Sequence, residues 1–395
     1  MTMKTEEKLP GSCGHGFDTD NSIIARPGNQ TGKRCLAGVL LIVLQTMLAA
    51  CTTHYIAGYS SVEFSADGQH IAAGTSQSVV ILNTDTYVTE QVLTMIPANG
   101  KKKKKKDTRY GNGDTLVFMG NERLASTGFG GLVSIWDVYT GELQATIAAD
   151  NEARIGVSVA WSETSGLLTV GTRNGEIYVY ELDGDDLFPL GKLRGHRSMV
   201  LDMVFGSRGR YMASTAQSES VLVWDMEAMK LFAQIKGSNG TIDLELVGDS
   251  NTLIAVGTDI KRWDFMTQED AGKLRDPSMA GQQAMMTGTV LLYAYSLVSV
   301  GYAGPVPGGV SASCRRTIAV SPDGSLLVDL QPGPFKEKIS VIDIENDKII
   351  QQLESNNLSC DAAFSPDGQQ LLIAANNTMY IYDTKTWRRT EIVTW

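Results

Sequence analysis

Six consecutive lysines form the densest concentration of like charge in the sequence. They are Lys101, Lys102, Lys103, Lys104, Lys105 and Lys106. Like charges at this spacing repel one another, so the run stays extended and cannot pack into a core. One interpretation is a basic loop that binds an anionic partner, such as lipid headgroups or acidic glycans. The alternative, a solvated loop without a ligand, is favoured because no aromatic residues are interleaved with the lysines.

Residue types that carry out catalysis are scarce. After residue 50 the only histidines are His54, His70 and His196, and no Cys-x-x-Cys-His, His-Glu-x-x-His or Gly-x-Ser-x-Gly motif occurs. Glycine-rich pieces such as residues 128–131 are not followed by a helix pattern, so they do not predict a phosphate site. We therefore predict no catalytic residue, no metal site and no cofactor.

An apolar run near the N-terminus predicts an export signal. Lys33 and Arg34 precede residues 36–50, which are almost entirely apolar. The run is too short to span a bilayer as a helix and matches the hydrophobic region of a secretory signal. The alternatives for residues 1–32, an unusually long polar start, are a later translation start or a cytoplasmic extension.

The run ends in Leu48-Ala49-Ala50-Cys51, which resembles the lipobox of bacterial lipoproteins. The resemblance implies cleavage before Cys51, lipidation of that cysteine and a membrane anchor, since several acyl chains on one residue hold a protein stably. Thr52 at the next position implies the outer membrane, facing the periplasm. The alternative is an ordinary signal peptide that ends near a cysteine.

Composition places the rest of the chain among ordered globular proteins. Of 395 residues, 43% are hydrophobic and 20% charged, and the net charge is -10. That composition excludes collagen-like and wholly disordered chains. The acidic balance argues against general affinity for nucleic acid.

Two short patterns recur along the chain and predict an all-β fold. The first is a strand pattern of apolar residues that ends in a large apolar or aromatic residue and an acid or Asn, and it occurs at residues 79–83, 133–137, 177–181, 221–225, 260–264, 339–343 and 379–383. The second is a strand followed by a tight turn, clearest as Ser-x-Asp-Gly at residues 65–68, 321–324 and 365–368. Repeats at this period predict stacked supersecondary units.

These patterns resemble the WD-repeat (WD40) family of β-propellers, in which each unit is a four-stranded antiparallel blade. The resemblance covers residues 60–395, and Gly195-His196 through Trp224-Asp225 is its strongest unit. It implies a hydrogen-bonded network of His196, Ser214 and Trp224 within that blade. Gln217-Ser218 stands where the family has an acid, so we expect the network to be incomplete.

The spacing of the strand pattern predicts seven blades. The interval between Trp263 and Ile342 is about twice one repeat of about 40–45 residues, so the alternative is an eighth, degenerate blade. We expect an N-terminal extension and signal at residues 1–50, a lipidated linker at 51–58 and a propeller at 59–395. Within the propeller, a Lys-rich loop lies at about 97–113 and a long insertion or degenerate blade at about 275–316. Because residues 388–395 can supply the last strand, we expect closure by packing between blades.

Propellers bind partners through the loops on one rim. The candidate rim residues here are Phe129, Arg154, Arg173 and Arg197. Cys314 and Cys360 each precede the inner strand of neighbouring blades and are a candidate disulfide, although inner strands diverge and a bridge needs Cα atoms within about 7 Å.

The sequence thus favours a non-catalytic protein-interaction scaffold in the bacterial cell envelope, anchored at Cys51 and bound to an unidentified envelope protein. The first alternative is a hydrolase or lactonase that uses carboxylates such as Asp202 and Asp361 in the central channel. The second is a binder of anionic envelope polymer through Lys101 to Lys106. Architecture alone does not decide among these three.

Overall fold

The computed structural model describes twelve segments of the chain, residues 59–75, 78–94, 115–127, 132–148, 156–206, 208–248, 250–257, 259–274, 316–331, 338–354, 359–375 and 378–393. The chain divides into two units, Met1–Thr53 and His54–Trp395. All described residues belong to the second unit. The predicted lipobox at Cys51 therefore lies outside them.

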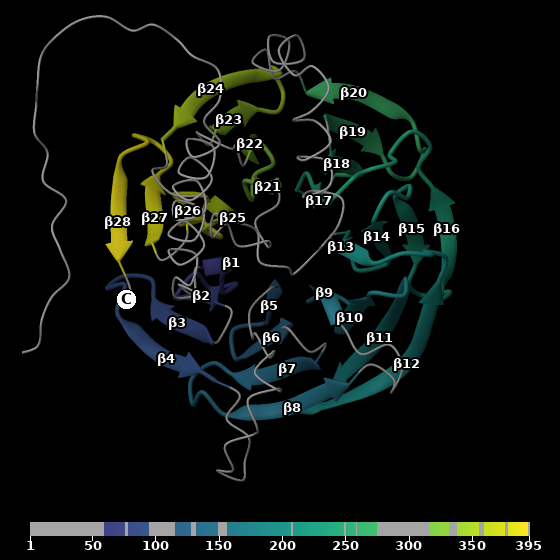
Figure 1. Cartoon of the computed structure of the whole chain (residues 1–395), viewed down its shortest axis with the longest axis horizontal. Coiled ribbons are helices and arrows are strands. Elements are labelled where there is room, and N and C mark those ends of the chain that lie inside the picture. Colours follow the sequence, from purple (N-terminus) through teal and green to yellow (C-terminus); the bar gives the residue numbers. More distant parts are fainter. Residues whose placement is uncertain are drawn as a thin grey trace, which may run out of the picture. The chain divides into compact units, whose positions relative to one another are not determined.

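The described residues form seven four-stranded antiparallel sheets, each built from four consecutive strands. In Figure 1 the first strand of every sheet lies nearest the centre and the fourth at the perimeter, so the sheets are the blades of a propeller. The predicted all-β fold and the count of seven blades are confirmed. The segment for which the alternative placed an eighth blade, about residues 275–316, lies outside the described residues except for Arg316.

The first four blades have the following strands. Blade 1 contains β1 (Tyr59–Phe64), β2 (His70–Thr75), β3 (Val79–Asn83) and β4 (Thr89–Leu93). Blade 2 contains β5 (Thr115–Met119), β6 (Arg123–Thr127), β7 (Leu132–Asp137) and β8 (Leu143–Ala148). Blade 3 contains β9 (Gly156–Ser162), β10 (Leu167–Thr172), β11 (Glu176–Asp183) and β12 (Asp186–Arg194). Blade 4 contains β13 (Val200–Phe205), β14 (Tyr211–Ala216), β15 (Leu222–Asp225) and β16 (Lys230–Gln234).

The last three blades repeat this order. Blade 5 contains β17 (Asp243–Leu246), β18 (Thr252–Val256), β19 (Ile260–Asp264) and β20 (Asp270–Leu274). Blade 6 contains β21 (Thr317–Val320), β22 (Leu326–Gln331), β23 (Lys338–Asp343) and β24 (Lys348–Leu353). Blade 7 contains β25 (Ser359–Phe364), β26 (Gln370–Ala375), β27 (Thr378–Asp383) and β28 (Arg389–Val393).

The acid of the recurring strand pattern shapes the turn into the outermost strand. Asp137 accepts hydrogen bonds from the backbone N–H groups of residues 139 and 140 at 3.0 and 2.8 Å, and Asp264 and Asp383 make the same pair of contacts two and three residues on. Asn83 makes these contacts in blade 1. A short side chain that bonds its own backbone nearby favours turns, which explains the recurrence of this residue type.

The Ser-x-Asp-Gly turns join the first and second strands of blades 1, 6 and 7. In blade 7 the Ser365 hydroxyl donates to Asp367 at 2.6 Å, and Asp367 accepts the Gln369 N–H at 3.0 Å. The Ser365 and Gln369 contacts hold the pKa of Asp367 below its usual value. Gly368 has φ +68°, which a residue with a Cβ adopts only with strain. Each turn is thus locally specified by its own sequence.

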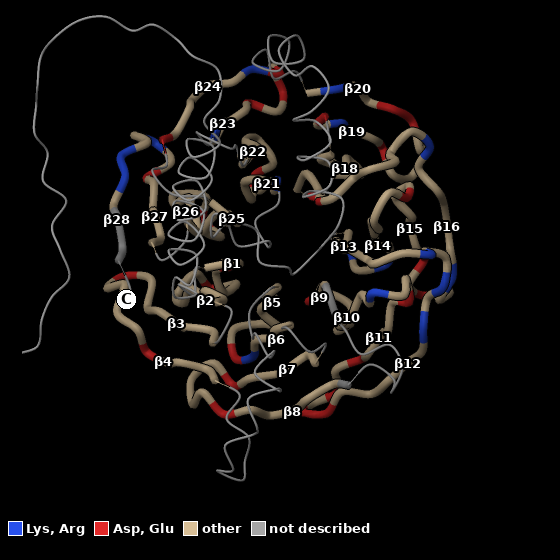
Figure 2. Tube along the Cα trace, in the orientation of Figure 1, with Lys and Arg blue, Asp and Glu red and all other residues tan. Residues whose placement is uncertain are grey.

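The hydrophobic core lies between blades. Seven clusters of buried side chains fill the seven junctions, and each cluster takes residues from two adjacent sheets. Trp136, Trp224 and Trp263, the tryptophans of the strand pattern, are among the largest fully buried side chains. Figure 2 shows that charged residues lie mostly at turns and on outer strands. Burial of one face of each strand against the next blade is therefore the main stabilising force.

The ring closes between blade 7 and blade 1 without exchange of a strand. Each of these sheets consists of its own four consecutive strands, β1 to β4 and β25 to β28. Tyr59, Phe64 and Val80 of blade 1 pack against Leu372 and Met379 of blade 7. Closure in the described residues rests on packing between blades, as the sequence predicted.

Candidate functional site

A hydrogen-bonded network ties two strands of blade 4, β14 and β15, and the turn between them to the connection that precedes the blade. The Trp224 indole N–H donates to the Ser214 hydroxyl at 2.7 Å, and His196 Nε2 lies 2.8 Å from the same hydroxyl. The other nitrogen of the imidazole, His196 Nδ1, lies 3.3 Å from Glu219 Oε2. A carboxylate therefore completes the network, whereas the sequence led us to expect none at Gln217-Ser218. The longer Glu219 side chain reaches the histidine from the next position.

The network determines where the His196 proton lies. Because Ser214 accepts from Trp224, its own hydrogen points to Nε2, and Nδ1–H donates to Glu219. Burial lowers the pKa of His196 although the Glu219 carboxylate opposes that shift. Glu219 also accepts from the Arg197 N–H at 2.8 Å and the Ser198 hydroxyl at 2.7 Å. The neutral imidazole thus fixes the connection that carries Arg197.

Two of the predicted rim arginines lie on connections that pack together. Arg173 is exposed in the turn between β10 and β11, and Arg197 is exposed between β12 and β13. A Cβ added to Gly175 would lie 2.5 Å from the His196 carbonyl oxygen and 3.0 Å from that of Ser198. Only glycine permits this approach, and its φ of +85° favours glycine as well. The two arginine-bearing connections are therefore held side by side.

The remaining rim and loop candidates fall outside the described residues. They are Phe129, Arg154 and the lysine run from Lys101 to Lys106. In the sequence, Phe129 falls between the second and third strands of a blade, as Arg173 does. Arg154 and the lysine run fall between the last strand of one blade and the first strand of the next, as Arg197 does. All of these candidates thus attach to strand ends on one face of the ring, which we call the loop face.

Cys360 is the second residue of β25, the innermost strand of blade 7, and it is buried. It is disulfide-bonded in the structure. Cys314 lies outside the described residues, so its pairing with Cys360 stays a prediction.

Carboxylates on the inner strands connect neighbouring blades. Asp202 Oδ2 accepts the Leu244 N–H of the next blade at 2.8 Å, and Asp243 Oδ2 accepts the Ile318 N–H of the blade after that at 2.8 Å. Asp361 Oδ2 accepts the Val62 N–H across the closing junction at 2.9 Å. These three aspartates occupy the same position, three residues before the last apolar residue of their inner strands. We call this shared contact the inner clasp.

Two glutamates add to the same inner surface. Glu63 Oε2 in β1 accepts the Phe118 N–H of blade 2 at 3.0 Å, and Glu245 lies in β17 two residues beyond Asp243. Burial, helped by the charges of neighbouring carboxylates, raises the pKa of Glu63 to about 8 and that of Asp361 to about 7, although the N–H groups that donate to them oppose the shift. Burial and the charges of Asp243, Asp361 and Glu63 raise the pKa of Glu245 well above its usual range.

From the sequence, Asp202 and Asp361 were candidates only as carboxylates for catalysis in the central channel. Glu63, Asp243 and Glu245 were not predicted as part of this inner surface. Aligning the inner strands on their turns would have placed the three aspartates at one position, but their closeness across the ring depends on closure. Because Asp202 and Asp361 are engaged in inner clasps, the structure favours a structural role for them.

Blade 6 holds an ion pair where blade 4 has the serine of its network. Arg316 and Asp329 form two hydrogen bonds, Nε to Oδ1 at 2.8 Å and Nη2 to Oδ2 at 2.7 Å. The exposed fractions of their side chains are 11% and 0%. Arg316 also donates to the Gly257 carbonyl of blade 5 at 3.1 Å. Asp329 faces Ile318 across the first strand pair just as Ser214 faces Met203, so the two positions are equivalent.

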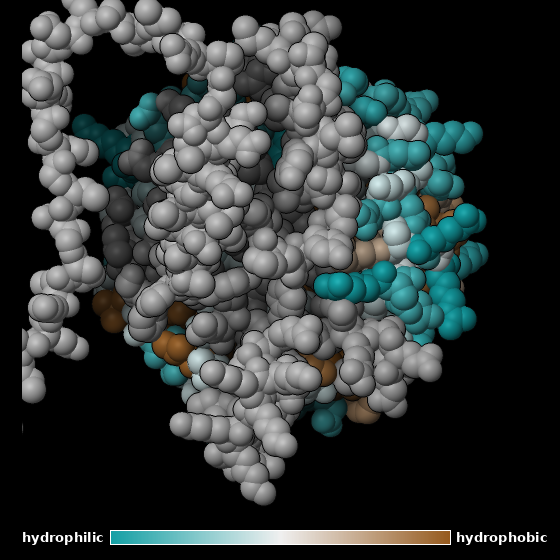
Figure 3. All heavy atoms as spheres, in the orientation of Figure 1, coloured by the Kyte–Doolittle hydropathy of each residue, from teal (hydrophilic) through white to brown (hydrophobic). Residues whose placement is uncertain are grey.

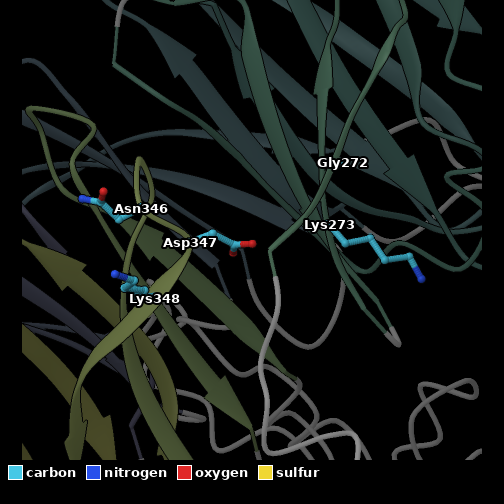
Figure 4. A pocket seen from close by; sticks show the side chains of 5 residues that line it. All are labelled: Gly272, Lys273, Asn346, Asp347 and Lys348. Atoms are coloured by element: carbon cyan, nitrogen blue, oxygen red, sulfur yellow. The ribbon is translucent and has the colours of Figure 1, made fainter.

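One pocket lies at the perimeter between blades 5 and 6. It is lined by Gly272 and Lys273 of β20 and by residues 346–348 at the turn into β24. Figure 4 shows Lys273 pointing away from Asp347 and Lys348, and its Nζ binds Asp259 at 2.6 Å. The polar groups therefore do not converge on a common point, as they would in a binding site.

Apolar side chains are exposed on several outer strands. Between 41% and 49% of each side chain is exposed at Val92, Leu143, Phe188, Leu190, Leu231, Phe232 and Ile350. Figure 3 shows apolar patches among hydrophilic atoms at the perimeter. Pro189 and a break in register in β12 interrupt the longest outer strand, which protects this edge from pairing with another chain.

No group of three or more His, Cys, Asp or Glu residues in the described part of the chain is arranged to hold a metal ion. No helix among the described residues is long and apolar enough to cross a membrane.

Comparison with known proteins identifies the repeat. The family described as "WD domain, G-beta repeat" matches residues 187–225, which run from β12 through β15 and include the His196 network. Apoptotic protease-activating factor 1 of Rattus norvegicus is 24% identical over 223 residues, covering 53% of this chain and 16% of the relative. Minichromosome loss protein 1 of Schizosaccharomyces pombe is 27% identical over 183 residues, covering 44% and 21%.

Another relative is WD repeat and SOCS box-containing protein 1 of Homo sapiens, 30% identical over 111 residues, covering 28% of this chain and 26% of the relative. The chain thus spans roughly a quarter or less of each of these curated relatives. A chain in the crystal structure of the mitotic checkpoint complex superimposes with a TM-score of 0.59 at 17% identity, covering 82% of this chain and 85% of the other. The matched repeat shows that this chain contains a WD repeat, and the seven four-stranded blades together with the likeness to this solved chain show that its fold is that of the WD-repeat β-propellers.

Proposed function

We propose that this WD-repeat propeller is a non-catalytic protein-interaction scaffold that binds its partner through the loop face. The observation that carries the proposal is the pair of exposed arginines, Arg173 and Arg197, whose connections are packed together through Gly175. Arginine is enriched among residues that dominate protein interfaces. A loop held rigidly also loses less conformational entropy when it binds.

The test compares two faces of one ring. A variant with Arg173→Ala and Arg197→Ala removes both side chains without touching the buried network. Its matched control is Arg388→Ala, an exposed arginine in the turn between β27 and β28 on the opposite face. Partners cross-linked to the wild-type protein in its native membrane fraction are identified, and their binding to the purified variants is measured. We expect the affinity to fall at least tenfold in the double variant and to be unchanged in the control.

Equal affinities of the double variant and the control contradict binding through this face. If only Arg388→Ala lost affinity, the interface would lie on the opposite face. That face carries the turns that join the first strand to the second and the third strand to the fourth.

The proposal extends to location. The order of basic residues, apolar run and Leu48-Ala49-Ala50-Cys51 supports lipidation of Cys51 and anchoring in the bacterial outer membrane, facing the periplasm. The mature protein from its native membrane is expected to begin at a Cys51 with the mass of several acyl chains. Cys51→Ala is expected to abolish that mass and release the propeller from the membrane. An unmodified chain that begins at Met1 contradicts this part of the proposal and leaves the scaffold role untouched.

A further inference from the structure

Four loop-face segments of blades 3, 4 and 5 are linked to one another. The close approach at Gly175 continues within blade 4, where the Ser198 hydroxyl donates to the Gln217 carbonyl at 2.7 Å. The Ser238 hydroxyl in turn accepts the Val221 N–H at 2.8 Å. The linked segments, which we call the loop platform, are residues 173–175, 195–199, 217–221 and 235–242. Hydrogen bonds and close packing thus hold the platform as one surface.

Three basic side chains on the platform are exposed to solvent. They are Arg173, Arg197 and Lys236, and none of their charged groups forms an ion pair or a hydrogen bond with a residue that the structure describes. Lys261, beside the platform in β19, donates to the Gly237 carbonyl at 2.8 Å and has no carboxylate partner among those residues. The positive charges of these four side chains are therefore not neutralised by the described part of the chain.

The acids in the same region are already engaged. Glu219 accepts the three contacts described above. Glu176, next to the platform in β11, accepts Arg194 Nε at 3.0 Å, and Asp259 pairs with Lys273 at 2.6 Å. The platform therefore presents positive charge, although the whole chain has a net charge of -10.

The opposite face of the ring is acidic. Every turn from a third to a fourth strand there has an acid within it or directly before it. These acids are Asp85, Asp137, Asp185, Asp225, Asp264, Asp343 and Asp383. The aspartates of the inner clasp lie on the inner strands and accept N–H groups of the next blade. Negative charge is thus concentrated away from the platform.

We propose that the loop platform binds an acidic segment of the partner, an extended peptide rich in Asp and Glu that lies across blades 3, 4 and 5. The inference rests on the proposed function and extends its interface from Arg173 and Arg197 to Lys236. An arginine guanidinium forms two parallel hydrogen bonds with a carboxylate, whereas a lysine ammonium adds charge without a fixed geometry. Because the platform is held in place before binding, the loops lose little conformational entropy when the peptide binds.

Two other anionic partners match the platform less well. No Phe, Tyr or Trp occurs in the four segments, so they offer no aromatic surface on which the bases of a single-stranded nucleic acid could stack. None of the large exposed apolar side chains of the described residues lies in these segments, so the platform has no group that would enter a lipid bilayer. Charge complementarity to carboxylates is therefore the chemistry that the platform offers.

Fluorescence anisotropy tests the proposal with the full chain and a fluorescein-labelled peptide of alternating Glu and Gly. A matched peptide has Gln in place of Glu, so that only the charge of the probe differs. We expect the wild-type protein to bind the Glu peptide about tenfold more tightly than the Gln peptide, and this preference to shrink as salt is added.

Variants locate the binding on the ring. Arg173→Glu with Arg197→Glu reverses two charges and is expected to weaken binding of the Glu peptide about tenfold, and Lys236→Glu alone about threefold. Arg388→Glu, an exposed position on the opposite face, is the matched control and should leave the affinity unchanged. If the double reversal does not fold, Arg173→Gln with Arg197→Gln removes the same charges and should weaken binding in the same direction.

Three results overturn the proposal. They are equal affinities of the wild-type protein for the Glu and Gln peptides, an unchanged affinity for the Glu peptide in a folded Arg173 and Arg197 double variant, and tighter binding of a single-stranded oligonucleotide or of anionic phospholipid vesicles than of the Glu peptide. The proposed function has its own readout, the affinity of the cross-linked partner for Arg173→Ala with Arg197→Ala. A partner that loses affinity there while the Glu peptide fails to bind leaves the scaffold role in place and removes only the acidic segment.

Discussion

Blades 4 and 6 hold the same backbone position with different chemistry. In blade 4 the uncharged hydroxyl of Ser214 joins His196 and Trp224, whereas in blade 6 the Asp329 carboxylate pairs with Arg316. In blade 4 the bridge joins the connection before the inner strand to the second strand. In blade 6 it joins the residue directly before the inner strand to the second strand. The comparison shows that a polar bridge at this buried position can be built either from the family's own residues or from an ion pair. The family pattern is therefore recognisable in blade 4 and absent from blade 6.

The largest effect is expected in blade 6. Asp329→Ala leaves the Arg316 guanidinium, which is 11% exposed, without its carboxylate, and such a loss costs about 3–5 kcal/mol of unfolding free energy. Urea denaturation at neutral pH measures it. Replacing both partners by Arg316→Met and Asp329→Leu should cost less than the single change, since no unpaired charge is left. A double variant that is less stable than Asp329→Ala would show that the ion pair itself, not its desolvation, dominates.

A smaller effect is expected in blade 4. Ser214→Ala leaves the Trp224 N–H and His196 Nε2 without a partner, and we expect a loss of about 2–3 kcal/mol. Blade 2 offers a matched control, because Trp136 donates to Ser126 at 2.9 Å and no histidine joins that pair. Ser126→Ala should therefore cost about 1–2 kcal/mol in the same denaturation experiment. Equal losses at the two serines would mean that His196 adds nothing to the network.

The smallest effect is a pH dependence confined to blade 4. Because burial lowers the pKa of His196 in the folded protein, the unfolded chain binds a proton more readily. The contribution of His196 to stability is thus complete above its unfolded pKa of about 6.5 and is lost as the pH falls below it. The stability difference between wild type and His196→Asn should shrink between pH 7.5 and pH 5.5. A difference that grows on acidification would mean that Glu219 holds the imidazolium in the folded state.

The sequence was sufficient to predict the fold because its signals are local. The Ser-x-Asp-Gly turns and the capped turns after Asp137 and Asp383 involve contacts only two to five residues apart, so their residue types recur visibly. The hydrogen-bonded network of blade 4 was predicted because the family pattern is intact there, at His196 and Trp224.

Long-range contacts were not predictable in the same way. Glu219 replaces the expected acid because a longer side chain reaches back from one position further on. The pairing of Arg316 with Asp329 joins residues 13 apart in a register that no repeated pattern marks. The crowding of Glu63, Asp243 and Asp361 appears only when the ring is closed.

The closing junction has a consequence for how the chain folds during synthesis. Within every blade the paired strands are neighbours in sequence, so each blade can assemble soon after it leaves the ribosome. The contact from Val62 to Asp361 spans 299 residues and cannot form before the last blade exists. Until that moment one face of blade 1 stays open to water, with Tyr59, Val62 and Phe64 uncovered. The first blade made is thus the last to be completed, and its exposed face is the part of the nascent propeller that most needs protection from aggregation.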